Sequence, residues 1–399
     1  MAKVIETRTL ADKTYTNPAD SNYLMLSAVE KYLTDLQRLQ DPKDINIQPS
    51  RFFVDLPHRE YMTGQATNNT QETPLLFTSH GAKLLANLVL PGHFFKGLRQ
   101  LSAMDQSGGE IATKAFQKFA SALNGKRVMI RTIRTRHPED HTKVVRAIRS
   151  CHSTKYAAYS NLQFVQDLRH SLDDKGFKNL PVLSWMLTDE RMRVRFCAMD
   201  DPHSAIAAAV GGTGNHPFLA GEPMPMFEVH NSEVGMRRIV VRAGVFLANK
   251  DVFIGAYGLG AEANWTHRGN IGRIRNQLAG TVEDIIQEAE DVCEAYRQAG
   301  EIEIEDAYAF LNAEIEQHVS ANIAKEITET LASQVAVKNL AQPAAGSALQ
   351  AALASLKTAS LAEVCEAVAT VAKQKDLAKQ YDLEKLAATI LHRGRKTLK

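Results

Sequence analysis

The chain has 399 residues, of which 44% are hydrophobic and 23% charged, and its formal net charge is +2. This composition excludes a wholly disordered chain, and the length predicts two or three domains with a large core. Four widely spaced cysteines, without a CxxC pair, exclude a disulfide framework or zinc module, and no apolar run or signal pattern suggests a membrane span or export, which favours a cytoplasmic protein.

The first 50 residues are expected to form a helical arm, because apolar residues recur at helical spacing from Leu24 to Leu39. A short extended piece is expected at Arg51–Asp55, followed by a polar loop over 64–73. Thr78 and Ser79 can cap a helix that runs to Leu90, where Pro91-Gly92 ends it.

The stretch 126–149 carries a net charge of +6. Its first part, Lys126–Arg136, is rich in β-branched residues and alternates, which predicts a strand. Pro138 is expected to occupy the first turn of a helix through Val144, Val145 and Ile148, and a second helix is predicted over Asn161–Leu172.

The clearest pattern is the segment Arg191–Phe196, with sequence RMRVRF. Successive residues of a strand point to opposite faces, so Arg191, Arg193 and Arg195 share one face and the apolar residues share the other. We therefore expect a sheet with one buried face and one exposed basic face.

Two further strands, around Met236–Val245 and Asp251–Tyr257, are predicted to form a hairpin within 235–275, a stretch with a net charge of +5. From Gly269 the pattern becomes helical, and 283–316 carries a net charge of −11. The low-complexity stretch 341–347 is predicted to be a linker that separates a C-terminal helical unit from the rest.

These elements predict an α+β protein: an antiparallel sheet with one basic face packs on helices, and acidic helices and a small C-terminal helical unit follow. The predicted domains are an N-terminal arm (1–50), a central α+β domain (51–280), an acidic helical segment (281–340), a linker (341–347) and a C-terminal unit (348–399).

Clustered arginines with interleaved flat side chains indicate a surface for single-stranded nucleic acid, because cations displace the counterions of the backbone and aromatic rings stack on bases. The predicted nucleic-acid-binding residues are Lys126, Arg127, Arg131, Arg134, Arg136, Arg191, Arg193, Arg195, Arg237, Arg238, Arg242, Trp265, His267, Arg268 and Arg273.

Other interpretations of these patterns remain open. The arginines can instead form a solvated sheet face that pairs with the acidic helices. His137 and His141 have the spacing of metal ligands on a helix, but Pro138 places His137 at or before the helix start and no third ligand is identifiable, so a capped helix N-terminus is the preferred interpretation. The glycines of 211–214 and 255–260 lack a phosphate-loop pattern, and no catalytic residue, metal or cofactor is predicted.

Three passages together resemble a phage/plasmid-like protein family of unknown function: Phe77–Leu98, Val144–Leu168 and Phe227–Gly269. The most specific element is the step Asn231-Ser232-Glu233-Val234-Gly235. The family usually has a Cys-Asn-Gly step after the second strand, whereas this chain has Ala256-Tyr257-Gly258, which puts any role of that step in doubt here.

The resemblance implies a protein of bacteriophages or plasmids that is a distant relative of single-strand annealing proteins such as phage Red-beta. It suggests a single-stranded DNA-binding and annealing protein of recombination or replication, homo-oligomeric, in the host cytoplasm and without a membrane partner. Two rivals remain: an interaction protein whose acidic helices bind a host replication or repair protein, and a metal-dependent enzyme.

Overall fold

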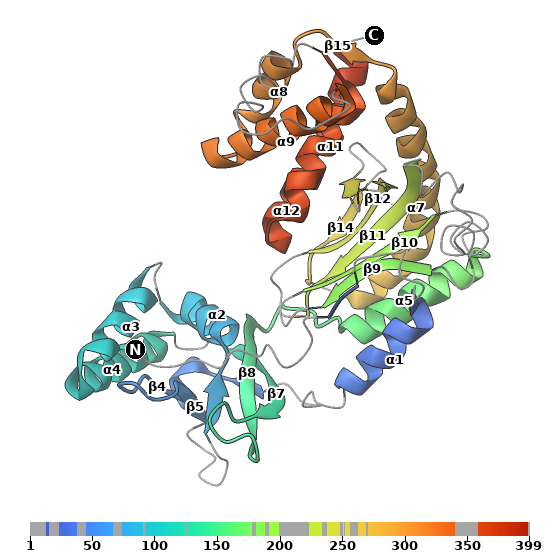
Figure 1. Ribbon diagram of the computed structural model, residues 1–399. Helices are drawn as coiled ribbons and strands as arrows, with labels where there is room; N and C mark the ends of the chain where they lie inside the picture. The colour runs from blue at the N-terminus through green and yellow to red at the C-terminus, as the bar shows by residue number, and fades with distance from the viewer. Residues whose placement is uncertain are drawn as a thin grey trace.

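A computed structural model describes residues 13–15, 24–37, 45–66, 74–90, 93–123, 127–177, 181–187, 191–198, 223–233, 238–247, 250, 252–255, 262–268, 270–339 and 358–397. It has a mixed α+β architecture built on two curled sheets, each with its own hydrophobic core, and the C-terminal part is helical (Figure 1).

The first sheet has the strand order β3-β7-β8-β6-β5-β4. All neighbours are antiparallel except β6 and β8, which are parallel. Its strands are β3 (Ile45–Ile47), β4 (Phe52–Asp55), β5 (Thr63–Ala66), β6 (Leu75–Phe77), β7 (Val128–Arg136) and β8 (Val144–Ser153).

Helices α2 (Ser79–Val89), α3 (Phe94–Met104) and α4 (Gln106–Ala122) cover this sheet, and a single 3₁₀ turn, η1 (Pro49–Arg51), precedes β4. The core between them contains Phe52, Phe77, Phe116 and Ile130, all almost fully buried. Thr78 caps α2 by accepting a hydrogen bond from the Gly81 amide at 2.9 Å, as its position before an apolar helical pattern predicts.

The second sheet is antiparallel throughout its described strands, in the order β1-β9-β10-β11-β12-β13, with β14 also paired to β12 and β2 to β9. Its strands are β1 (Lys13–Tyr15), β2 (Leu24–Met25), β9 (Pro181–Leu187), β10 (Met192–Cys197), β11 (Pro223–Asn231), β12 (Ile239–Leu247), β13 (Val252–Gly255) and β14 (Glu262–Trp265).

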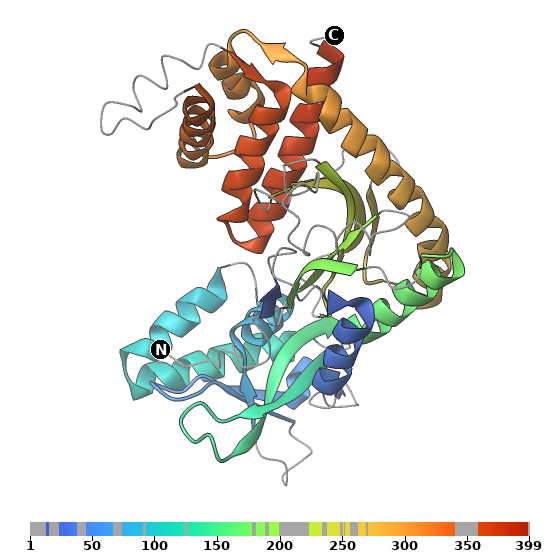
Figure 2. The ribbon, with the colours of Figure 1, turned by 45° about the vertical axis from the view of Figure 1, so that its right-hand side comes forward.

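Helices lie on both sides of the second sheet (Figures 1 and 2). On one side are α1 (Leu26–Gln37), α5 (Asn161–Asp174) and the long α7 (Ile271–Gly300). On the other are α11 (Leu361–Lys373) and α12 (Leu377–Thr397), and beyond the sheet lie α8 (Ala307–Ile315), α9 (Ala321–Asn339) and the short pair β15 (Glu303–Ile304) and β16 (Ala359–Ser360).

Most of the predicted elements are confirmed: α1, α2, α5, β4, β7, β10, the β12–β13 hairpin and the helical region from α7 onward. The loop expected over 64–73 begins with residues of β5, and its remainder, from 67, lies outside the described residues. The helix predicted after Pro138 is wrong, because the chain turns over 138–143 and continues as β8. Pairing with β7 and β6 on its two edges holds this segment extended.

The predicted alternation in β10 is confirmed, but the predicted exposed basic face is wrong. Met192, Val194 and Phe196 lie in the core, as expected. Arg193 and Arg195 lie on the opposite face, yet they are only 5% and 4% exposed, and Arg242 of β12 is 1% exposed. The reason is that α12 packs across this face of the sheet.

The C-terminal helices are not the separate unit that the sequence suggested. Leu361, Val368 and Leu383 belong to the same hydrophobic core as Val194 and Ile254 of the second sheet. The predicted linker, 341–347, lies outside the described residues. The predicted central domain, 51–280, contains strands of both sheets and therefore two cores.

Candidate nucleic-acid interface

The buried face of the second sheet carries an arginine cluster, which we define as Arg193, Arg195 and Arg242 with Glu228 of β11 and Glu384 of α12. Arg195 Nε donates to Glu228 Oε2 at 2.6 Å and its Nη2 donates to Glu384 Oε1 at 2.5 Å. Arg242 bonds the same two carboxylates, at 2.7 Å and 2.5 Å. These arginines bind acids of the chain itself and do not face solvent.

A second polar site lies where the two sheets meet, and we call it the junction. Its centre is a stack of three rings: His152 of β8, Tyr156 in the turn after β8, and His267 after β14. The His152 and Tyr156 centroids are 3.9 Å apart with an interplanar angle of 11°, and those of Tyr156 and His267 are 5.2 Å apart at 23°. The sequence prediction included His267 but missed its two ring partners.

The turn Asn231-Ser232-Glu233 ties the junction together. Glu233 is 4% exposed, and its carboxylate accepts from Arg149 Nη1 at 2.6 Å and from the Asn161 amide at 2.5 Å. Arg131 Nη1 donates to the Glu233 carbonyl oxygen at 2.9 Å. One acidic residue in the turn after β11 therefore bonds to β7 and β8 of the first sheet and to the N-terminus of α5.

Arg149 reaches Glu233 because of a β-bulge. The register of β7 and β8 shifts so that Arg131 pairs with Ser150 while Thr132 pairs with Ile148, which leaves Arg149 as the extra residue. Such a bulge re-aims one side chain out of the alternating pattern. Here it directs a guanidinium toward the second sheet.

The histidines of the stack are neutral at pH 7. Burial, with a contribution from Arg131, lowers the pKa of His152 to about 3. Burial also lowers the pKa of His267 to about 4. Among the described residues, the buried Nε2 of His152 has no hydrogen-bond partner.

For Glu233, the neighbouring positive groups outweigh the effect of burial on the pKa. Burial alone would raise its pKa, but Arg149, the Asn161 amide and Arg131 together hold the pKa of this carboxyl below its usual value. Glu233 is therefore ionised at neutral pH, and it neutralises only part of the surrounding positive charge.

Exposed cations surround the stack. Lys155 precedes Tyr156, Arg268 forms a β-bridge with Tyr156, and Arg273 lies in the first turn of α7. No acid among the described residues pairs with any of these three side chains. The N-terminus of α7, capped by Asn270, adds the positive end of a helix dipole at the same place. We call these three cations the rim.

The remaining predicted residues that the structure describes are not part of the junction as defined above. Arg127, Arg134 and Arg136 are exposed on or beside β7, and Arg127 donates to the Asn46 carbonyl. Arg191 is half-buried beside β10, and exposed Arg238 donates to Asn264 Oδ1. Half-buried Trp265 packs against the second core and donates to Gln277 Oε1 at 3.0 Å. Lys126 and Arg237 lie outside the described residues.

The three passages that carry the family resemblance meet at the junction. The first contributes His80. Its effect on the lowered pKa of His152 is smaller than that of burial or of Arg131. The second contributes Arg149, His152 and Tyr156, and the third contributes Glu233 and His267. Segments far apart in the sequence thus form one polar site, and their shared position was not readable from any single motif.

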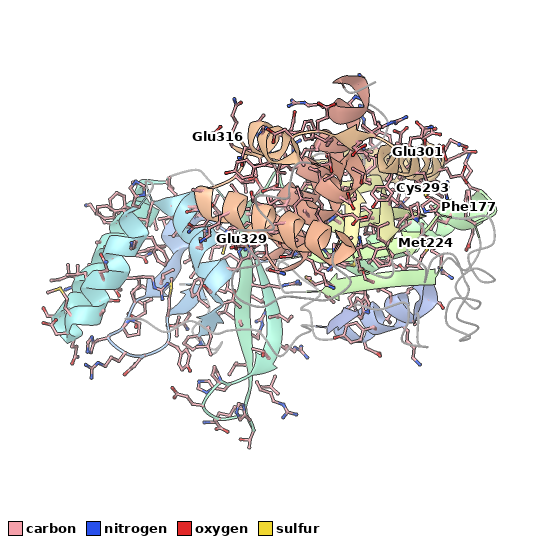
Figure 3. The ribbon with its side chains drawn as sticks, turned by 45° about the horizontal axis from the view of Figure 1, so that its top comes forward. Phe177, Met224, Cys293, Glu301, Glu316 and Glu329 are labelled. Atoms are coloured by element: carbon pink, nitrogen blue, oxygen red, sulfur yellow. The ribbon has the colours of Figure 1, made fainter. Side chains whose placement is uncertain are left out.

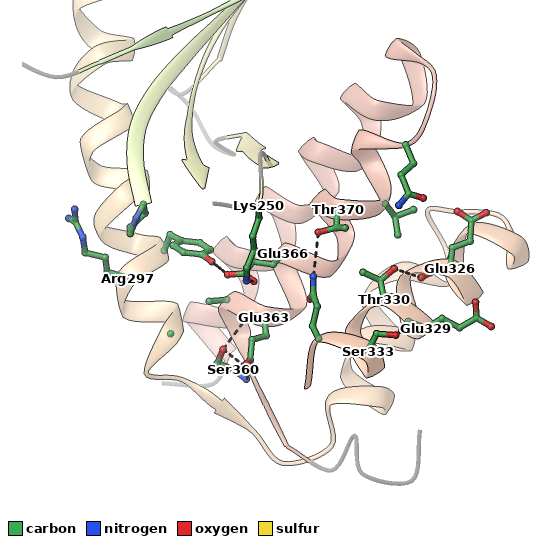
Figure 4. Close-up of a pocket in the computed structure, with 17 residues that line it drawn as sticks. Lys250, Arg297, Glu326, Glu329, Thr330, Ser333, Ser360, Glu363, Glu366 and Thr370 are labelled. Atoms are coloured by element: carbon green, nitrogen blue, oxygen red, sulfur yellow. Dashed lines mark hydrogen bonds and ion pairs between the residues drawn. The ribbon is translucent and has the colours of Figure 1, made fainter. Parts of the chain in front are cut away.

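A large pocket of about 1230 Å³ lies elsewhere, between α7, α9 and α11 (Figure 4). Four glutamates, Glu326, Glu329, Glu363 and Glu366, and two cations, Lys250 and Arg297, line it. Lys250 pairs with Glu366, and Lys375 pairs with Glu326. In Figure 3, Glu301, Glu316 and Glu329 project from the same helical part of the molecule. We call the pocket lined by Glu326, Glu329, Glu363 and Glu366 the acidic pocket.

The structure does not place His137 and His141 on a helix. His137 Nδ1 accepts from the amides of Glu139 and Asp140 in the turn between β7 and β8. No group of three or more His, Cys, Asp or Glu side chains within the described ranges is arranged to hold a metal ion. Gly255 ends β13 beside Arg242, whereas 211–214 and 256–260 lie outside those ranges.

None of the helices that the structure describes is long and apolar enough to cross a membrane. Comparisons of the chain with protein-family models, with curated proteins and with solved structures gave no match. Function therefore has to be inferred from the site itself.

Proposed function

We propose that the protein binds single-stranded DNA at the junction and acts as a phage-type annealing protein in recombination or replication. The observation that carries this proposal is the rim, Lys155, Arg268 and Arg273, around the three-ring stack. Clustered cations at a helix N-terminus favour phosphate groups. His152 and His267 are buried and only Tyr156 of the stack is partly exposed, so the cations are expected to supply most of the binding.

Annealing places a further demand on such a site. The backbone must be held while the base edges stay free to pair, and contacts to phosphate satisfy this because they carry no sequence information. The exposed rim suits this role better than the arginine cluster, whose guanidinium groups are already occupied by Glu228 and Glu384. Partners would include further copies of the chain, which align several such sites.

The test is a salt titration of binding to a fluorescent oligo(dT), followed by anisotropy. We expect affinity to fall with salt, and the double variant Arg268→Ala/Arg273→Ala to reduce the magnitude of the logarithmic salt slope by roughly 0.7 for each lost phosphate contact. The loss should be similar for other single-stranded sequences.

The matched control is Arg275→Ala, on the same helix as Arg273, because Arg275 already pairs with Asp167 at 2.9 Å. It should bind like the parent. Parent binding without salt dependence, or a double variant indistinguishable from Arg275→Ala, would count against the proposal.

A second candidate function is suggested by the acidic pocket, whose lining fits a partner with a Lys- and Arg-rich segment, such as a host replication or repair protein. Calorimetric titration with a basic peptide tests it. The double variant Glu326→Gln/Glu329→Gln should weaken the interaction, while Glu290→Gln on the exposed side of α7 should not. Equal binding by both variants would remove this candidate.

A further inference from the structure

The arginine cluster holds more positive than negative charge. Three guanidinium groups, of Arg193, Arg195 and Arg242, lie beside the carboxylates of Glu228 and Glu384, and all five side chains are at most 7% exposed. A buried charge without a partner is costly, because the interior does not solvate it as water does. Among the described residues, this cluster therefore has one positive charge more than it has negative charges.

Arg193 is the arginine of the cluster that has no carboxylate within hydrogen-bond distance among the described residues. Its nearest carboxylate oxygen, Oε2 of Glu228, is 3.9 Å from its Nε, beyond hydrogen-bond distance. Glu228 already accepts from Arg195 and Arg242. Among the described residues the buried Nε of Arg193 has no hydrogen-bond partner.

The other groups that face the cluster, within the described ranges, do not supply a compensating negative charge. Burial lowers the pKa of His230, which lies 2.5 Å from Glu228 Oε1, so this ring is neutral at pH 7. Burial raises the pKa of Tyr381, so its hydroxyl is also neutral. Glu262 is already matched by Lys385 at 3.5 Å, and Gln380 is uncharged.

The electrostatics of Arg193 agree with this geometry. Burial and then the neighbouring Arg195 lower the pKa of Arg193 to about 10, whereas Glu384 and Glu228 raise the pKa of Arg195 despite its burial. At pH 7 Arg193 still carries its proton. It is thus a charged, buried guanidinium whose nearest acid in the described part of the chain, Glu228, is already hydrogen-bonded to two other arginines.

We propose that Arg193 is a binding site for an oxyanion of the phosphate class, held inside the second sheet next to α12. A guanidinium presents several N–H donors in one plane, which match the oxygens of a phosphate better than a spherical halide. The phosphate group comes either from inorganic phosphate or from a nucleotide or nucleic acid. This site is separate from the junction and does not depend on the proposed function.

The experiment compares thermal unfolding of the full chain in sodium chloride and in sodium phosphate at equal ionic strength. Parent Tm should rise with phosphate in a saturable way. In Arg193→Met the Tm without phosphate should equal or exceed that of the parent, because a buried charge with only a distant, shared acid is gone, and the saturable response should disappear. Any remaining shift measures the general effect of phosphate on protein surfaces.

Arg275→Met is the matched control, since it removes an arginine that is paired and largely outside the core, and it should keep the parent response. If Arg193→Met does not fold, equilibrium dialysis of phosphate against the parent and Arg193→Lys replaces it. Loss of the planar donor group should then raise the apparent Kd about tenfold, as expected for one charge-assisted hydrogen bond.

Further arms separate the sources of the phosphate group. Stabilisation by inorganic phosphate identifies the free ion, whereas stabilisation by a nucleoside monophosphate or oligo(dT) alone identifies a nucleotide or strand. A parent without a saturable response to any of these, or an Arg193→Met response equal to that of the parent, would overturn the proposal. The rim variant Arg268→Ala/Arg273→Ala should keep the phosphate response, so this result is independent of DNA binding.

Discussion

Glu384 is the residue through which α12 closes the second sheet. Its two carboxylate oxygens accept from Arg195, Arg242 and Gln380, and the side chain is 2% exposed. Removing one member of a buried ion network leaves its partners charged and unpaired, which costs more than the intact network contributes. Glu384 is therefore expected to be sensitive to substitution.

Replacing Glu384 with Gln should lower the free energy of unfolding by about 3 to 5 kcal/mol, the range for breaking a buried ion pair on one side. Urea denaturation followed by circular dichroism measures this. The control is Glu290→Gln on the exposed surface of α7, which should change stability by less than about 0.5 kcal/mol. Equal effects of the two variants would show that Glu384 is not part of a buried ion network.

The neutral histidines of the junction predict an acid-sensitive stability. Their folded pKa values of about 3 for His152 and about 4 for His267 lie below the unfolded value, so the unfolded chain takes up protons first as the pH falls. Stability should thus decrease from about pH 6.5 downward, by roughly 1.4 kcal/mol per histidine and pH unit, until the folded pKa values are reached.

Urea denaturation at pH 7 and pH 5 checks this prediction in a range where most carboxyl groups do not titrate. His152→Gln should be less sensitive to this pH change than the parent, because one group with a lowered folded pKa is gone. The exposed His170, which pairs with Asp174 on α5, supplies the control variant His170→Gln. An unchanged pH dependence in His152→Gln would contradict a neutral, buried His152.

The sequence of a single strand predicts which side chains share a face of the sheet. It does not predict whether that face is exposed to solvent. Alternation placed Arg193 and Arg195 opposite Val194 correctly, since it depends only on the strand period. Their burial depends on Glu384, which is 189 residues from Arg195 in the chain. No local pattern reports such a distant partner.

Helix α2 lies directly against β8, and Gly81 permits this approach. A Cβ at this position would lie 2.2 Å from the carbonyl oxygen of Ile148, closer than atoms can come without a backbone shift. The same carbonyl accepts the Thr78 hydroxyl at 2.9 Å, so the helix start is fixed to the strand. His80 is thereby held near the junction.

Gly81→Ala should therefore destabilise the protein, by about 1 to 3 kcal/mol as for other overpacked sites. Gly97→Ala is the matched control: Gly97 is also inside a helix, but its Cβ would meet nothing within 4 Å. That substitution should stabilise by roughly 0.5 to 1 kcal/mol, because alanine loses less entropy in a helix. Denaturation curves that shift in the same direction for both would refute the close packing of α2 on β8.

The wrong helix prediction for β8 has a structural cause. Its bulge at Arg149 brings Ile148 and Cys151 to the same face, where both join the first core. Their separation of three positions is typical of a helix and not of a strand. Elements without such an irregularity, such as α2 and α5, were predicted close to their observed bounds.

The C-terminal helices complete the core of the second sheet, and this decides how the whole molecule responds to truncation. Val364, Val368 and Ile390 are fully buried in the core that contains Ile254 and Leu278. The first sheet has its own core with α2 and α4. The two parts of the molecule therefore depend on α11 and α12 to different extents.

Ending the chain after Asn339 should destabilise the second sheet while the first sheet stays folded. Hydrogen exchange should show lost protection in β10–β13 and α7 and retained protection in β7, β8 and α2, because only the former pack on the missing helices. A parallel variant that ends after Thr397 is the control. Parent-like protection throughout the shorter chain would support the separate C-terminal unit expected from the sequence.

The mixed α+β class and the helical C-terminal part were predictable, because they follow from periodicity along each segment. The existence of two cores was not, since 51–280 alternates between strands and helices without a break in composition. The junction was missed for a related reason: its parts come from β8, β11 and the segment after β14, which only the folded chain brings together.

The length of helix α7 sets the distance between the rim and the acidic pocket. Arg273 of the rim lies in its first turn, and Tyr296, Arg297 and Gly300 of the acidic pocket lie near its end. Its 30 residues span about 45 Å at 1.5 Å per residue. Single-stranded DNA at the rim and a basic partner at the acidic pocket would therefore not compete for the same surface. The number of residues in α7 would set the distance between the two bound molecules.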